Sequence, residues 1–126
     1  MRLSSHAANV SANAVCKSMN NGAIYLFTGE NAQSSSTLAR LQFGAQAFSL
    51  AKNGVAKSLP IAADREARAA GRAAWFRVYN ADESLVILEG SVGTANADLV
   101  LSDTAIERGA VVSIDQFVYT QSMKGC

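Results

Sequence analysis

The hydrophobic residues of this chain fall in short runs, and most of these runs alternate with polar residues at the period of a β-strand. The clearest case is residues 71–90, where Trp75, Arg77 and Tyr79 share one face of a predicted strand. A polar turn separates this strand from the apolar run 85–88. That run does not alternate, which is typical of a strand buried on both faces. We therefore predict an antiparallel hairpin at the centre of a two-layer β structure.

Similar runs predict further strands at residues 23–28, 37–43, 47–51, 55–59, 98–102 and 110–120. Asn53 and Gly54 lie between two of them, and this dipeptide is a strong signal for a tight hairpin turn. Residues 29–36 are interpreted as a polar loop, and residues 62–70 as a loop with at most one helical turn. About eight strands with turns between them predict an all-β fold, a jelly-roll-like β-sandwich.

The N-terminal residues follow a helical pattern instead. Small apolar residues recur at helical spacing over residues 4–19, and Ser4 or Ser5 can cap the helix. Because this face is mostly alanine, which buries little area, we expect residues 1–20 to form an arm or helix. This arm would contact another chain and lie loose on its own domain. The remaining residues, 21–126, would form the β-sandwich domain.

Length and charge exclude several classes of protein. A chain of 126 residues makes one domain with a real core. Its 11 Lys and Arg residues nearly balance 10 Asp and Glu residues, which argues against a dedicated nucleic-acid binder. No apolar run is long enough to span a membrane. Cys16 and Cys126 do not make a disulfide framework, so both are expected to be free thiols in a reducing cell.

Reactive constellations are not evident in the sequence. The only histidine, His6, lies in the predicted arm, and no serine occupies a G-x-S-x-G elbow. No cluster of metal ligands is evident, and the carboxylates in turns and near strand ends are interpreted as solvated. We therefore expect no enzymatic activity, no metal and no cofactor.

Three arginines, Arg65, Arg68 and Arg72, lie within eight positions of an otherwise sparsely charged chain. Guanidinium groups at this spacing could bind a phosphate or the acidic surface of a partner. The alternative is a solvated loop with local ion pairs, which would contribute little to stability.

The aromatic residues Trp75 and Tyr79, together with Tyr25, allow three interpretations. They could form a platform on which a sugar ring stacks, or they could pack in the core. They could also be buried in a protein interface, where Trp, Tyr and Arg are concentrated. The sequence leaves all three open.

Several short stretches of the chain, taken together, resemble a known group of proteins. They are residues 24–29, 53–56, 71–78, 89–94, 97–101 and 108–112. The most specific is Ala-Ala-Trp-Phe-Arg-Val, residues 73–78, followed by Gly-Ser-Val-Gly at residues 90–93. Together they resemble a group of small, β-rich structural proteins of tailed bacteriophages and prophages, over most of the chain from about Gly22. The charged residues 64–68 depart from the small polar loop that is usual there in this group.

This resemblance implies a virion building block rather than an enzyme. We expect a capsid cement, or decoration, protein on the outer surface of a phage head, made in the cytoplasm of the host bacterium. Its partners would be the major capsid protein, whose subunits it bridges, and further copies of itself in a dimer or trimer. The alternative is a tail or baseplate component that binds host glycan through Trp75 and neighbouring tyrosines.

Overall fold

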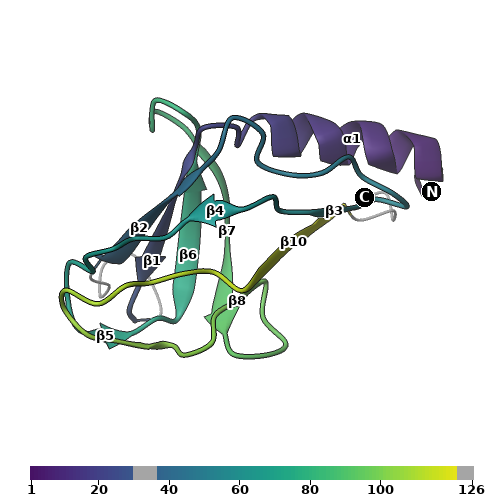
Figure 1. Ribbon diagram of the computed structural model, residues 1–126. Coiled ribbons are helices and arrows are strands. Elements are labelled where there is room, and N and C mark those ends of the chain that lie inside the picture. The colour runs from purple at the N-terminus through teal and green to yellow at the C-terminus, as the bar shows by residue number, and fades with distance from the viewer. Residues whose placement is uncertain (30–36, 122–126) are drawn as a thin grey trace.

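The computed structural model describes residues 1–29 and 37–121. Over this part of the chain, one helix, α1 (Ser5–Lys17), precedes ten strands (Figure 1). The strands are β1 (Ala23–Phe27), β2 (Thr37–Phe43), β3 (Val55–Lys57), β4 (Ile61–Ala62), β5 (Gly71–Arg72), β6 (Trp75–Tyr79), β7 (Val86–Gly93), β8 (Leu99–Val100), β9 (Ala105–Ile106) and β10 (Gln116–Thr120). The structure is mostly β with one short N-terminal helix, as the sequence predicts. Cys126 and most of the predicted loop 29–36 lie outside the described residues.

Eight of the strands form one sheet, in the order β3-β10-β8-β7-β6-β1-β2-β4, and β5 pairs with β9 in a separate ribbon. The two edge strands, β3 and β4, are joined by only three residues, 58–60. A flat sheet would hold its edges about 34 Å apart, whereas this linker spans at most about 14 Å. The sheet must therefore curl until its edges approach one another, as Figure 1 shows.

The core fills the inside of this curl. Phe117 of β10 is at its centre, because its ring centroid lies 5.2 Å from that of Phe76, 5.4 Å from that of Phe48 and 6.2 Å from that of Phe43. All four rings are buried. These residues come from segments far apart in the sequence, so the aromatic cluster holds opposite parts of the curled sheet together.

The tight turn predicted at Asn53 and Gly54 is present. Lys52 and Val55 exchange both backbone hydrogen bonds at 2.9 Å across the turn. The two residues between them have φ angles of 51° and 78°, the left-handed values that a type I′ turn requires. Residues 62–70 contain no helical turn, in agreement with their interpretation as a loop.

Helix α1 begins where the sequence predicts, because the Ser4 side chain accepts a hydrogen bond from the backbone N–H of Ala7 at 3.1 Å. The helix lies across one end of the curled sheet and packs against β3 and β10 (Figure 1). Ala8, Ala12 and Met19 are completely buried. The alanines let the helix backbone approach the sheet closely, which a face of larger residues would prevent.

Asparagine side chains complete the docking of this helix. Their Oδ1 atoms accept hydrogen bonds at 2.8 Å from backbone N–H groups of the segment 47–54: Asn9 from Gly54, Asn13 from Ala51, and Asn20 from Ala47. Those N–H groups would otherwise need another partner. The expectation that residues 1–20 lie loose on their own domain is therefore wrong, because close packing and amide hydrogen bonds replace the large apolar surface that the segment lacks.

Three strand predictions need correction. Residues 47–51 form no strand, because within this run only Phe48 makes a β-bridge, to Ser58. The long strand predicted at 110–120 shrinks to β10, because Val112 pairs with Asp64 and the N–H of Asp115 donates to the carbonyl of Val100. Val112 and Phe117 are both buried although they are an odd number of residues apart. A continuous strand would place two such residues on opposite faces. The run 85–88 is not buried on both faces, since Val86 is 46% exposed. It lies at the end of β7, where one side of the sheet faces outward.

Candidate interaction surface

The four longest neighbouring strands, β2, β1, β6 and β7, present one face to the core and one to the outside. Their register arranges the outward side chains in three rows across the sheet: Gln42–Ala23–Tyr79–Val86, Arg40–Tyr25–Arg77–Glu89 and Thr37–Phe27–Trp75–Ser91. We call these twelve residues the outer face. On β1 and β6 the alternate residues, such as Leu26 and Phe76, are at most 1% exposed, whereas on β7 they are partly exposed. Strand alternation therefore separates a conventional core from an outer face rich in aromatic residues and arginine.

Aromatic rings on the outer face contact one another across the strands. Phe27 and Trp75 stack with 4.3 Å between centroids, and Tyr25 meets Tyr79 edge to face at 5.4 Å. The indole N–H of Trp75 donates to the carbonyl of Thr28 at 3.1 Å, which fixes the ring. The sequence-based choice between core and surface for Trp75 is thus resolved: the ring is half-buried on the outside of the sheet.

Arg77 lies at the centre of this arrangement. Its guanidinium is 5.3 Å from the Trp75 ring centroid and 6.0 Å from that of Phe27, within the range of cation–π attraction. Nη1 donates to the Tyr79 hydroxyl at 3.3 Å, and Nη2 lies 3.4 Å from a Glu89 carboxylate oxygen. The hydrogen bond to Tyr79 and the nearby carboxylate of Glu89 raise the pKa of Arg77. Its Nε is buried and has no hydrogen-bond partner in the described part of the chain.

The turn between β6 and β7 reaches onto the outer face through Glu83. This residue has a left-handed φ of 58°, and its carboxylate accepts hydrogen bonds from the Tyr25 hydroxyl and, at 3.0 Å, from Nη2 of Arg40. The hydrogen bond from Tyr25, followed by the one from Arg40, lowers the pKa of Glu83. Burial, followed by the hydrogen bond to Glu83, raises the pKa of Tyr25. The guanidinium of Arg68 lies 5.7 Å from the Tyr25 ring centroid, beside this cluster.

A depression of about 360 Å³ opens between these groups. It is lined by Tyr25, Phe27, Thr37, Arg77, Tyr79 and Glu83. Its walls offer aromatic edges, hydroxyl groups, a guanidinium and a carboxylate. Such groups can hold a polar or charged side chain from another molecule.

The structure brings only part of the predicted site together. Trp75 and Tyr79 lie on the outer face, and Arg68 lies at its border. Arg65 is exposed on the loop, while Arg72 of β5 donates from Nη1 to the Thr104 hydroxyl at 3.1 Å. Arg68 and Arg72 therefore contact different groups, because the chain enters the β5–β9 ribbon between them.

Sequence reasoning missed three contributors to the site. Arg40 and Phe27 join it because β2 and β6 pair with β1 on either side, and Glu83 joins it because its turn folds back. Alternation along a single strand identifies which residues share a face. It does not identify the neighbouring strand or its register, so nothing in the sequence indicates that these three residues belong to the site.

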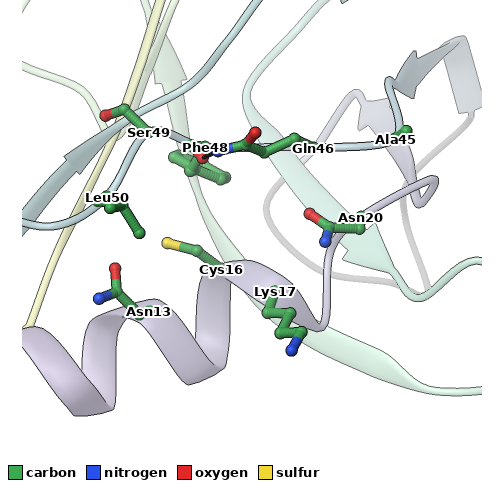
Figure 2. Close-up of a pocket in the computed structure, with 9 residues that line it drawn as sticks. All are labelled: Asn13, Cys16, Lys17, Asn20, Ala45, Gln46, Phe48, Ser49 and Leu50. Atoms are coloured by element: carbon green, nitrogen blue, oxygen red, sulfur yellow. Dashed lines mark hydrogen bonds between the residues drawn. The ribbon is translucent and has the colours of Figure 1, made fainter.

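A second cavity, of about 550 Å³, lies between α1 and the segment 45–50. Figure 2 shows the Cys16 sulfur pointing toward this segment, while the Lys17 side chain extends away from it. Burial raises the pKa of Cys16 to about 11, so its thiol is protonated at neutral pH and is a poor nucleophile. Leu50, at the rim, is 75% exposed. The cavity therefore combines an unreactive thiol with amide and apolar groups.

Among residues 1–29 and 37–121, no group of three or more His, Cys, Asp or Glu side chains is placed to hold a metal ion. No helix within the same ranges is long and apolar enough to cross a membrane. Comparison with known proteins adds no relative: no protein-family model matches the chain, and no significant match is found among curated proteins or solved structures.

Proposed function

We propose that this chain is a non-enzymatic structural protein whose outer face is buried against a neighbouring protein chain in an assembled particle. The observation that carries the proposal is the composition of that face. Tyr25, Phe27, Trp75, Arg77 and Tyr79 occupy the outward side of a sheet whose other side is the core. A sheet face that meets only water is usually polar, whereas Trp, Tyr and Arg are concentrated in protein interfaces.

The particle we propose is a phage virion, as the sequence resemblance implies. The chain would act as a capsid cement protein on the outer surface of the head, bridging subunits of the major capsid protein. Many symmetric copies would multiply contacts that are individually weak. A jelly-roll-like sandwich is the finer fold that we propose for it, and the curl of the eight-stranded sheet around a single core supports that assignment.

Binding of host glycan by a tail or baseplate protein is the competing function. A sugar platform needs an aromatic ring with a free face. The Trp75 ring, however, already stacks on Phe27 and has the Arg77 guanidinium 5.3 Å from its centroid. The outer face is therefore better suited to a protein partner than to a stacked sugar ring.

The direct test is binding of the purified chain to capsids that lack it, in parallel with binding to host polysaccharide. We expect binding to capsids, at least about fivefold weaker for Trp75→Ala, because truncating an interface tryptophan commonly costs more than 1 kcal/mol. Leu50→Ala is the matched control, since it removes an exposed apolar side chain elsewhere. Binding to polysaccharide alone, or capsid binding that Trp75→Ala leaves unchanged, would contradict the proposal.

A further inference from the structure

Charge is unevenly distributed along the middle row of the outer face. Arg40 on β2 and Glu89 on β7 lie at its two ends, with Tyr25 and Arg77 between them. Neighbouring strands are about 4.8 Å apart, so the two ends are separated by about 14 Å. Each end residue has an ion-pair partner in its own chain, yet 29% of the Arg40 side chain and 49% of the Glu89 side chain stay accessible. A partner that lies over this row can therefore reach both charges.

In one orientation, a second copy of the chain places an opposite charge over each of the two charged ends of this row. If the two copies face each other across a two-fold axis parallel to the strands and between β1 and β6, the row of one copy is reversed over the other. Arg40 of each copy then lies opposite Glu89 of the other copy. An axis perpendicular to the strands would instead place Arg40 against Arg40 and Glu89 against Glu89, which is unfavourable. The charge pattern thus selects the first orientation of a closed, symmetric pair.

The same orientation suits the other groups on the face. Tyr25 of one copy lies opposite Arg77 of the other, and Phe27 lies opposite Trp75. A guanidinium of one copy therefore meets an aromatic side chain of the other, and aromatic side chains meet each other across the axis, which favours close packing of the two faces. Glu83, which is bonded to Tyr25, comes close to Arg77 of the second copy. The ends of the third row, Thr37 and Ser91, meet as two small hydroxyl side chains.

We propose that the outer face is the self-association surface of this protein and that the protein forms a two-fold dimer by packing this face on that of a second copy. This inference rests on the proposed function, in which the outer face is an interaction surface, and it names the neighbouring chain. Four strands and about five residues per strand span roughly 19 by 17 Å. Such an area is at the low end for protein interfaces, so the dimer is weak in isolation.

Charge reversal tests this dimer. Analytical ultracentrifugation of the wild-type chain from about 5 to 500 μM should show a monomer–dimer equilibrium that high salt shifts toward monomer. Arg40→Glu and Glu89→Arg should each be monomeric over this range, because each places like charges opposite one another. An equimolar mixture of the two variants should recover the dimer, since the introduced glutamate of one chain then faces the introduced arginine of the other.

The mixture also separates contacts within a chain from contacts between chains. Each substitution removes an ion pair inside its own chain, with Glu83 or with Arg77. That change is identical in the single variant and in the mixture, so recovery can only come from pairing between chains. Arg108→Glu and Glu107→Arg reverse two exposed charges outside the outer face and should leave the equilibrium unchanged.

Crosslinking gives a second reading that does not disturb the charges. In a Cys126→Ser background, Thr37→Cys and Ser91→Cys chains should be joined by a short bis-maleimide when mixed, and each should crosslink far less efficiently with itself.

A wild-type chain that is monomeric at 500 μM, a dimer that survives either charge reversal, or a mixture that fails to dimerise would overturn the inference. A wild-type chain that binds capsids but stays monomeric would overturn the dimer and leave the proposed function standing, and a wild-type chain that dimerises but does not bind capsids would overturn only the proposed function.

Discussion

The ring of Phe27 stacks on the ring of Trp75 with 4.3 Å between their centroids and 21° between their planes. The two residues are register partners in β1 and β6, and both point away from the core. On the opposite side of the same strands, Leu26 and Phe76 are buried in the core. Aromatic packing therefore occurs on both sides of this sheet, and the outward pair gives the outer face its largest apolar feature.

The Phe27–Trp75 stack should couple the two residues energetically. In a double-mutant cycle with Phe27→Ala and Trp75→Ala, we expect a coupling of about 0.5–1.5 kcal/mol in the free energy of unfolding. Urea unfolding of the dilute protein, followed by circular dichroism, would measure it. The control pair Phe27→Ala and Leu50→Ala, which lie in separate parts of the fold, should be additive. A coupling near zero for the stacked pair would mean that the two rings do not stabilise each other.

The carboxylate of Glu83 should make stability depend on pH. Its pKa is lowered in the folded protein by the hydrogen bonds from Tyr25 and Arg40. The stabilisation is therefore fully present above the unfolded pKa of about 4.3 and is lost as the pH falls through the lower folded value. The free energy of unfolding should be lower for Glu83→Gln than for the wild type at pH 7, and the difference should disappear under acid conditions.

Urea titrations at intervals from pH 7 to pH 2.5 would follow this difference. Glu66→Gln, an exposed carboxylate in the loop before β5, is the matched control and should follow the wild type. If the difference in the free energy of unfolding between Glu83→Gln and the wild type were constant over the whole pH range, the negative charge of Glu83 would not stabilise the folded state.

The asparagine contacts of α1 should contribute measurably to stability. Asn13→Ala leaves the backbone N–H of Ala51 without its 2.8 Å acceptor, which should lower the free energy of unfolding by about 1–3 kcal/mol. Val10→Ala, on the exposed side of the same helix, should change it by less than about 0.5 kcal/mol. Hydrogen exchange should also show protected amides in Ser5–Lys17 of the wild type. Rapid exchange throughout the helix would contradict this account of its docking.

Burial should make Cys16 slow to react. With a pKa of about 11, only about a thousandth of this thiol is ionised at pH 8, against about a quarter of an ordinary thiol. In a Cys126→Ser variant, labelling by a disulfide reagent should be at least a hundredfold slower in native protein than in 6 M guanidinium chloride. Equal rates in the two conditions would show that the helix does not shield the sulfur.

Local patterns in the sequence predict several elements well. The run 37–43 coincides with β2, and the Asn53–Gly54 turn has the expected left-handed angles. The cap at Ser4 is equally local. Each of these depends on the residue itself or on close neighbours in the chain, so periodicity and turn chemistry are sufficient.

Features that depend on distant partners could not be predicted in the same way. From the sequence alone, Asn13 is predicted to be a solvent-exposed helix residue. Its role follows only from the fold, which places the backbone N–H of Ala51 within hydrogen-bond distance of its side chain. The residues 110–115 alternate like a strand, but Val112 pairs with Asp64 instead of continuing β10. For the outer face, alternation identifies Trp75 and Tyr79 as sharing one side of a strand. Only the register of four strands adds the residues around them.

The central claim is that the outer face becomes buried when the protein assembles. Trp75 is the only tryptophan in the chain and lies on this face, so hydroxyl-radical footprinting of its ring measures the claim directly. Oxidation of Trp75 and Tyr79 should be several-fold slower in purified particles containing the protein than in the dilute chain, while Leu50 is oxidised equally in both. Equal oxidation of Trp75 in particles and in the free chain would show that the outer face stays exposed to water, which contradicts the proposed role of this surface.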